Sequence, residues 1–242
     1  GSGSEKVEDE LHRYFPRARV ARLDRDTAQG KDSYERILGG FREHRFDILV
    51  GTQMIAKGHD IANVTLVGVV SADTGLGLPD FRAAERTFQL LTQVAGRAGR
   101  HHLPGRVVVQ SLNPDHYAIR HAAKQDYVGF YEKELEFRRL MRYPPFSALA
   151  NVLVRAEKQE DAERMSGVVA DLLAHAGEGV KVLGPADAPV PRLKNEFRRQ
   201  TLVKSASRPR LNELLRGVLR HAADEKWPAG ALVIDVDPFS LL

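Results

Sequence analysis

The chain of 242 residues contains no cysteine. Disulfides, a thiol nucleophile and a cysteine-ligated zinc site are therefore excluded within these residues. The nine histidines form no HExxH or HxxxH pattern with supporting carboxylates, and the sequence predicts no metal site. No apolar run approaches the roughly 20 residues that a membrane-spanning helix needs. The opening GSGS also lacks the basic and apolar regions of a signal peptide, so we expect no membrane partner.

Two motifs that hold and hydrolyse a nucleoside triphosphate are also missing. No GxxxxGK[ST] phosphate loop occurs in the sequence. The closest approach to a DExH box is DEKW at 224–227, which ends in tryptophan. We therefore expect that this chain by itself does not hydrolyse ATP.

The composition is that of a folded globular protein, with 43% hydrophobic and 28% charged residues. A length of 242 residues is sufficient for two domains. The formal net charge is only +4, so a basic excess matters for function mainly where the cations gather on one surface.

The first half of the sequence alternates helical and strand patterns. Apolar residues recur at helical spacing in some segments, and short β-branched runs closed by small residues lie between them. We predict helices over 5–15, 31–43 and 81–100, and short buried strands over 20–23, 47–52, 64–70 and 106–110. This alternation favours an α/β fold in which helices cover a parallel sheet.

One long helix is predicted to follow. Asn113 and Pro114 make a favourable helix start, and the helical pattern continues to about Met141. The prolines of RYPPF (142–146) then end the helix. We place a domain boundary there, which divides the chain into 1–142 and 143–242.

The second half has a different order of elements. Strand patterns occupy 148–156, 180–190, 197–206 and 231–237, and helical patterns occupy 158–176 and the segment that begins at Ser207. The resulting order, βαββαβ, predicts a small α+β domain of the ferredoxin-like type.

The string QVAGRAGR (93–100) is the sharpest functional signal. If the helix continues through it, Gln93, Arg97 and Arg100 project from one face, because they are four and three residues apart. Two neighbouring guanidiniums can bind the γ-phosphate of a nucleotide held by another domain, and Gly96 and Gly99 keep that surface clear. A solvated basic helix end is the alternative, but the complete QxxGRxGR string favours the phosphate contact.

A second string, GTQMIAKGHD (51–60), follows a predicted buried strand. It therefore lies at the strand's carboxyl end, where α/β proteins bind ligands. Thr52 can offer its hydroxyl and main chain to a nucleic-acid phosphate. Asp60 can contact a ribose or an opposing arginine, and Gly58 permits the turn. Taken alone, this string is better explained as a structural turn with a capping aspartate.

Together the two strings resemble motifs V and VI of superfamily 2 helicases. The run SADTGLGLPDFRAAERTFQLLTQVAGRAGR (71–100) is similar to the PriA family (primosomal protein N′) of replication-restart helicases. EKVEDELHRYFP, RLDRDT, NPDHYAI, YPPF and IDVDP are also similar to that family. The resemblance covers essentially the whole chain.

The resemblance implies a bacterial protein that is located in the cytoplasm and associates with the nucleoid. The first domain is then the second RecA-like lobe of an ATP-dependent 3′→5′ DNA helicase that acts at stalled forks. It implies arginine fingers at Arg97 and Arg100, ATP contacts at Gln93, Gly58 and Asp60, and a DNA contact at Thr52. ATP and Mg²⁺ are then bound only in the full-length protein, with an upstream lobe 1, and the family's zinc site lies upstream of these residues.

The stretch from Arg192 to Arg220 is rich in cations. By the same resemblance, this domain contacts forked or single-stranded DNA, the acidic tail of single-stranded-DNA-binding protein and other primosome proteins, and cations suit these anionic partners. We predict DNA contacts at Lys194, Arg198, Arg199 and Lys204, and contacts with the acidic tail at Arg198 and Gln200. A basic face without a partner is the alternative, because strand alternation divides these side chains between two faces.

Three functions remain open at this point. The chain is part of a motor whose phosphate loop lies upstream, or a fork-binding scaffold whose parent protein lacks ATPase activity, or a stand-alone nucleic-acid-binding protein. The intact arginine string favours the first, since residues used only for hydrolysis have no other evident purpose. An upstream reading frame with a phosphate loop and a DExH box distinguishes the first from the other two.

Overall fold

The computed structural model describes residues 2–24, 27, 31–56, 64–99, 104–174 and 177–241. The chain divides into two compact units, Gly1–Leu76 with Arg86–Tyr127, and Gly77–Glu85 with Val128–Leu242. This division differs from the predicted boundary between 142 and 143. The helix before that boundary and the segment 77–85 both belong to the second unit. Contacts between segments far apart in the chain, which the sequence pattern does not record, define the two units.

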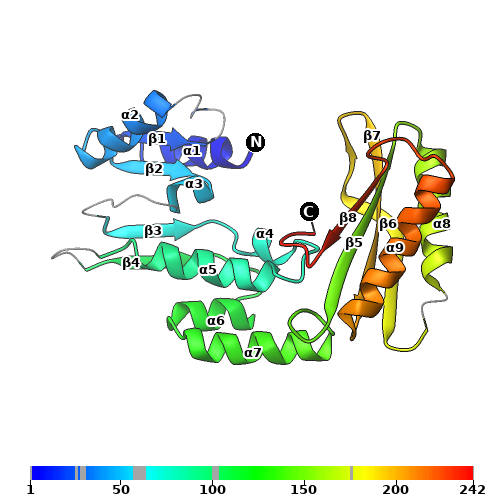
Figure 1. Ribbon diagram of the computed structural model, residues 1–242. Coiled ribbons are helices and arrows are strands. Elements are labelled where there is room, and N and C mark those ends of the chain that lie inside the picture. The colour runs from blue at the N-terminus through cyan, green and yellow to red at the C-terminus, as the bar shows by residue number, and fades with distance from the viewer. Residues whose placement is uncertain are drawn as a thin grey trace. The chain divides into compact units, whose positions relative to one another are not determined.

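The first unit opens with a pair of parallel strands. Its elements here are α1 (Ser2–Tyr14), β1 (Val20–Leu23), α2 (Lys31–Arg42), β2 (Ile48–Gly51) and α3 (Gln53–Ala56) (Figure 1). β1 and β2 pair in register, with Val20 opposite Ile48. Leu23 on β1 and Leu38 on α2 are fully buried and form the centre of a small apolar cluster. The helical stripe of α2 therefore covers the strand pair, as expected for a βαβ crossover.

The same unit contains a second strand pair. Its elements are β3 (Leu66–Val69), α4 (Asp73–Leu76), α5 (Ala83–Ala95) and β4 (Arg106–Val109). β3 and β4 are parallel, with Leu66 opposite Arg106, and α5 buries Phe88 and Leu91. Among the described residues the four strands form two separate two-stranded sheets. The prediction of parallel pairing is confirmed, but the strands do not form the single sheet that the sequence predicted.

The single long helix predicted after β4 is wrong, because the structure has two helices there. α6 spans Tyr117–Ala123 and α7 spans Tyr127–Leu140. His116 caps α6, in place of the predicted cap Asn113. Gln125 has φ +53, a left-handed conformation that a continuous α-helix does not contain. The chain therefore turns between the two helices.

The second unit contains an antiparallel sheet with two long helices. Its further elements are β5 (Ala148–Ala156), α8 (Gln159–Ala174), β6 (Val180–Leu193), β7 (Glu196–Ser205), α9 (Arg208–Asp224) and β8 (Leu232–Val236). This is the predicted βαββαβ order. The strands lie in the order β6-β7-β5-β8, and every neighbouring pair is antiparallel.

Both helices cover one face of this sheet (Figure 1). Val152 and Val154 of β5 point into that layer with Val203 of β7, and Val169 of α8 and Leu211 of α9 meet them there. The alternation of β5 follows directly from this packing, since every second side chain is buried against the helices. Ser207 caps α9 through its hydroxyl, which accepts a hydrogen bond from the main-chain N–H of Arg210.

In the first unit a buried carboxylate joins α1 to the end of β1. The Oδ2 of Asp24 accepts a hydrogen bond from the Ser4 hydroxyl at 2.6 Å, and its Oδ1 accepts one from the Thr27 main-chain N–H at 3.0 Å. These bonds, Ser4 first, lower the pKa of Asp24 to about 2 from the usual 3.8. The carboxylate therefore stabilises the fold above about pH 4, and this contribution is lost as the pH falls toward 2.

We expect Asp24→Asn to lower the free energy of unfolding by about 2 kcal/mol at neutral pH. The reason is that the amide cannot carry the charge that these donors favour. Urea unfolding of both proteins between pH 7 and pH 2 measures the effect, and the difference should shrink as the pH falls. A difference that is equally large at both ends of this range contradicts the assignment.

Candidate nucleotide and DNA contact sites

The string 93–100 does not continue as a helix, and this part of the sequence prediction is wrong. α5 ends at Ala95. The main-chain N–H of Gly96 still bonds to the carbonyl four residues back, at 3.1 Å, but that of Arg97 bonds to Val94, three residues back, at 3.0 Å. Arg97 therefore lies in the turn that follows α5, half-buried, rather than on the helical face of the exposed Gln93.

This turn is fixed by a close contact between two glycines. The main-chain N–H of Gly99 bonds to the carbonyl of Val64, just before β3, at 3.0 Å. Gly99 has φ +74, and a Cβ placed on Gly105 would lie 2.0 Å from the Gly99 nitrogen. Both positions therefore require glycine. Gly96, in contrast, has ordinary van der Waals space for a side chain.

The second string is described only in part. Thr52 is exposed and follows β2, and its carbonyl accepts a hydrogen bond from the Ile55 N–H at 3.1 Å. A Cβ on Gly51 would lie 2.2 Å from the Leu23 carbonyl oxygen, so the strand must end on a glycine. Thr52 is thereby presented at the carboxyl end of β2, as predicted. Gly58, Asp60 and Arg100 lie outside the described residues.

In the second unit, strand alternation separates the predicted cations. Arg199 lies on the helix side of β7, where its Nε donates to the Ser166 hydroxyl and its Nη1 bonds to Asp187 at 2.9 Å. Arg198 and Gln200 lie on the opposite face, which the two helices leave open. Arg199 is thus partly neutralised by a carboxylate, while Arg198 donates a long 3.3 Å hydrogen bond to the Val190 carbonyl.

Lys204 is buried, with 4% of its surface exposed. Its Nζ donates to the Met141 carbonyl at 3.0 Å and lies 3.3 Å from the centroid of the Tyr143 ring. Burial, and then the charge of Lys181, lower the pKa of Lys204 to about 8. The prediction that Lys204 contacts DNA is therefore wrong, because its ammonium group faces the linker before β5 rather than solvent.

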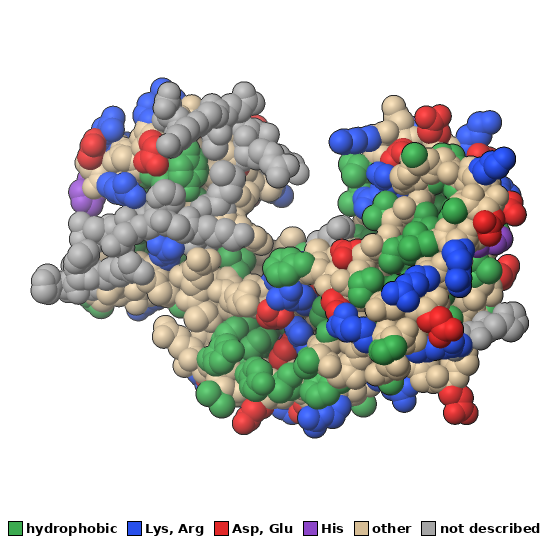
Figure 2. Space-filling model, viewed as in Figure 1, with side chains coloured by type: hydrophobic (Ala, Val, Ile, Leu, Met, Phe, Trp, Pro, Cys, Tyr) green, Lys and Arg blue, Asp and Glu red, His purple; other side chains and the backbone are tan. Residues whose placement is uncertain are grey.

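Lys194 stands at the tip of the β6–β7 hairpin. Lys194 and Asn195 both have positive φ, 51° and 65°, as a two-residue type I′ turn requires. The side chain of Lys194 is exposed there. Figure 2 shows that, on the face in view, the cations of the second unit are interspersed with carboxylates. Of the predicted DNA contacts, Lys194 and Arg198 are the two that could bind a phosphate without first losing an ion pair or leaving a buried position.

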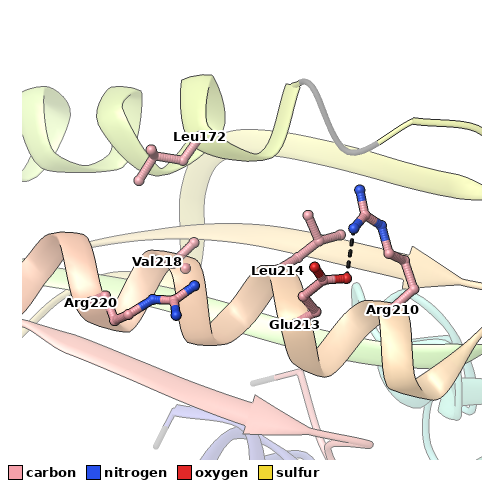
Figure 3. Close-up of a pocket in the computed structure, with 7 residues that line it drawn as sticks. Leu172, Arg210, Glu213, Leu214, Val218 and Arg220 are labelled. Carbon is pink, nitrogen blue, oxygen red and sulfur yellow. Dashed lines mark hydrogen bonds and ion pairs between the residues drawn. The ribbon is translucent and has the colours of Figure 1, made fainter.

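A shallow groove runs between α8 and α9. Leu172, Leu214 and Val218 line it, and Arg210 and Arg220 lie toward its two ends (Figure 3). Glu213 forms an ion pair with Arg210 at 2.7 Å. The groove is on the helix side of the unit, so it is separate from the open sheet face that carries Arg198.

A network of charges around α7 was not anticipated from the sequence. Arg138 donates to Glu134 at 2.7 Å and to Glu85 at 2.6 Å, and Arg82 donates to Glu85 at 2.8 Å. The Arg82 bond is the main cause of the lowered pKa of Glu85. The helical spacing of Glu134 and Arg138, four residues apart, and of Arg82 and Glu85, three apart, could have indicated part of it.

Within the part of the chain that the structure describes, no group of three His, Cys, Asp or Glu side chains could hold a metal ion. No helix there is both long and apolar enough to cross a bilayer.

Two family models match the chain. Residues 3–102 match the helicase conserved C-terminal domain, and residues 139–239 match the primosomal protein N C-terminal domain. The two matches cover the two halves of the chain in the order that the sequence motifs indicated.

Several curated proteins are similar over the whole chain, and each is described as a replication restart protein PriA. That of Bacillus subtilis (strain 168) is 45% identical over all of this chain and 30% of its own length. That of Chlamydia pneumoniae is 42% identical over 99% of this chain and 32% of its own length. That of Haemophilus influenzae is 39% identical over 100% of this chain and 33% of its own length. The chain thus spans about a third of the length of these relatives. A solved structure, the de novo designed protein Foldit4, matches 37% of this chain over 92% of its own length, at a TM-score of 0.30 and 12% identity.

We expect Gly105→Ala to destabilise the chain by about 1–3 kcal/mol, the usual cost of forcing an extra methyl into a packed site. The added Cβ overlaps the Gly99 main chain, which no side-chain rotation can relieve. Gly68→Ala on the neighbouring strand is the matched control, because a Cβ there meets nothing within 4 Å. Thermal unfolding of both variants measures the effect, and equal stability of the two contradicts the close contact.

Proposed function

Because the chain belongs to the replication restart protein PriA family and corresponds to its C-terminal part, we propose that it supplies half of a DNA-helicase motor. In this proposal the first unit is the second RecA-like lobe of an ATP-dependent 3′→5′ helicase that restarts replication at stalled forks. The second unit is a ferredoxin-like domain that binds DNA. The similarity over the full chain to proteins described as PriA supports the assignment, as do the parallel strand pairs and the antiparallel sheet.

The observation that carries the proposal is the fixed turn after α5. Arg97 stands in a turn held by the Gly99–Val64 bond and by the packing of Gly99 on Gly105. A guanidinium on a rigid support stabilises the charge that spreads over a transferred phosphoryl group without reorganising during the reaction. In our proposal Arg97, with Arg100, acts on the γ-phosphate of ATP, and Gln93 contacts the nucleotide.

The nucleotide itself is held elsewhere in this scheme. The sequence has no phosphate loop, so ATP and Mg²⁺ bind to an upstream lobe of the longer protein. When bound, they supply the transferable phosphoryl group and its counter-charge. Thr52, exposed at the end of β2, contacts a DNA phosphate, and Gly58 and Asp60 complete the nucleotide side of the same string.

The second unit binds DNA through its open sheet face in this proposal. Lys194 at the hairpin tip and Arg198 on the face itself contact phosphates, while Arg199 has a structural part, bridging α8 and β6. Arg198 and Gln200 contact the acidic tail of single-stranded-DNA-binding protein, and other primosome proteins dock on the assembled chain. Such a protein works in the bacterial cytoplasm, at the nucleoid.

We expect Arg97→Ala in the full-length protein to lower the kcat of DNA-dependent ATP hydrolysis by roughly 10³-fold, because arginine fingers contribute on this scale. The affinity for DNA should stay unchanged, since Arg97 faces the nucleotide in this scheme. Arg106→Ala is the control, an exposed arginine at the start of β4. Turnover that survives Arg97→Ala, or a full-length protein without a phosphate loop, would support the fork-binding scaffold instead.

We expect the DNA affinity of the chain to fall steeply with salt, because phosphate contacts release counterions. Arg198→Ala and Lys194→Ala should each reduce the slope of log K against log salt by about 1, the value for one lost phosphate contact. Lys204→Met should leave the slope unchanged, because that ammonium group is buried. Fluorescence anisotropy with single-stranded DNA between 50 and 200 mM salt, roughly the range over which such contacts are resolved, measures all three. Equal slopes for all the variants exclude the open face as the binding surface.

A further inference from the structure

Two arginines stand directly opposite each other on the sheet face that α8 and α9 leave open. Arg155 of β5 pairs in register with Arg198 of β7. Both side chains point away from the helix layer, because Val154, the neighbour of Arg155, points into it. Like charges directly opposite on one face of a sheet repel each other. This end of the open face therefore favours an anion between the two guanidiniums.

Contacts within the second unit neutralise these two charges only in part. The Nε of Arg155 donates to the Gly230 carbonyl at 2.9 Å, and its Nη1 lies 3.5 Å from the Glu196 carboxylate. The long hydrogen bond of Arg198 is to a neutral carbonyl. At the other end of the face, the exposed Asp235 of β8 disfavours an anion. The charge of the face thus fixes the end at which a negative group of a ligand lies.

Two side-chain amides occupy the middle of the same face. Asn151 lies on β5 and Gln200 on the adjacent β7. The Oδ1 of Asn151 and the Oε1 of Gln200 are buried and have no hydrogen-bond partner among the described residues. A buried acceptor without a donor is unfavourable. Because the terminal torsion of an amide is broad, each amide can turn over and offer a ligand either its oxygen or its NH2 group.

Apolar side chains flank the two amides. Leu153 lies between Gln200 and Val233 across the strands, and Leu202 lies opposite Asn151. Val233 is 39% exposed, and both leucines are half-buried. An unpaired base is recognised by packing its flat face on side chains of a sheet and by hydrogen bonds to its edge. The open face offers both kinds of contact within neighbouring rows.

We propose that the middle of the open face binds an unpaired base of single-stranded DNA, with the adjoining phosphate between Arg155 and Arg198. This proposal rests on the proposed function of the open face in DNA binding. The base lies on the apolar side chains and turns its edge to the two amides. An amide has a donor beside an acceptor, as the pairing edge of every base has, so the site accepts any of the four bases. In a duplex these edges are already paired, so the site selects single strands.

The experiment measures binding of the whole chain by fluorescence anisotropy to three probes of equal length. They are a single-stranded oligonucleotide, an abasic strand with the same phosphates, and a duplex. The single strand should bind at least about fivefold tighter than the abasic strand, the low end for one base packed on a protein surface.

Asn151→Leu combined with Gln200→Met removes both amides and keeps the side chains close to their original size. The double variant should fold, because it replaces two buried acceptors that have no donor with apolar groups. It should bind the single strand about fivefold more weakly, since the base loses its edge contacts. Its binding of the abasic strand and of the duplex should be unchanged, because the phosphate contacts remain.

Two single variants serve as controls. Arg155→Ala removes a phosphate contact, so it should weaken binding of the single strand and of the abasic strand by the same factor. Gln159→Met changes an exposed amide on α8, which lies on the helix side of the sheet. It should leave the binding of every probe unchanged.

Equal binding of the single and abasic strands by the unaltered chain, or an equal loss of both in the double variant, overturns the inference and leaves the phosphate contacts of the proposed function standing. If the unaltered chain binds none of the probes, the proposed function of the open face fails, and the inference fails with it. An acidic peptide is the alternative occupant, and polyglutamate tests it. If the double variant loses as much affinity for polyglutamate as for the single strand, the amides serve a peptide and the inference is wrong.

Discussion

The close approach of Gly99 to Gly105 is the constraint on which the candidate nucleotide site depends. A side chain at Gly105 would overlap the Gly99 main chain, and Gly99 itself has a positive φ that favours glycine. This contact, with the Gly99–Val64 hydrogen bond, ends α5 and leads the chain into β4. Arg97 is thus held by the main chain around it rather than by a longer helix, and a rigid main chain suits a group that must meet a developing charge.

The same helix joins the two compact units, because the division between them falls within α5. Its first turn belongs to the unit that contains the antiparallel sheet, and the rest belongs to the unit with the parallel strands. The carboxylate of Asp80 and the network of Glu85 and Arg138 concentrate the fixing interactions at that first turn. Within the second unit, these contacts hold the start of α5 against α7 and the C-terminal segment.

Strand alternation decides which cations of the second unit can meet an anionic partner. Arg198 and Arg199 are neighbours in sequence but lie on opposite faces of β7, and only the first is on the open face. Lys204 shares the face of Arg198, yet Tyr143 and the main chain of Met141 cover it. Counting cations along the sequence therefore overstates the basic surface, since each cation's neighbours in space determine its role.

The sequence by itself determined the element order, the parallel pairing, the cap at Ser207 and the family, because periodicity, caps and motifs are local properties of the chain. It also indicated Arg97 as the residue of interest. Only the tertiary structure decided that α5 stops before Arg97 and that Lys204 is buried. It also joined Asp80 to residues 240 and 241. Each of these depends on contacts between distant segments, and such contacts leave no periodic trace in the sequence.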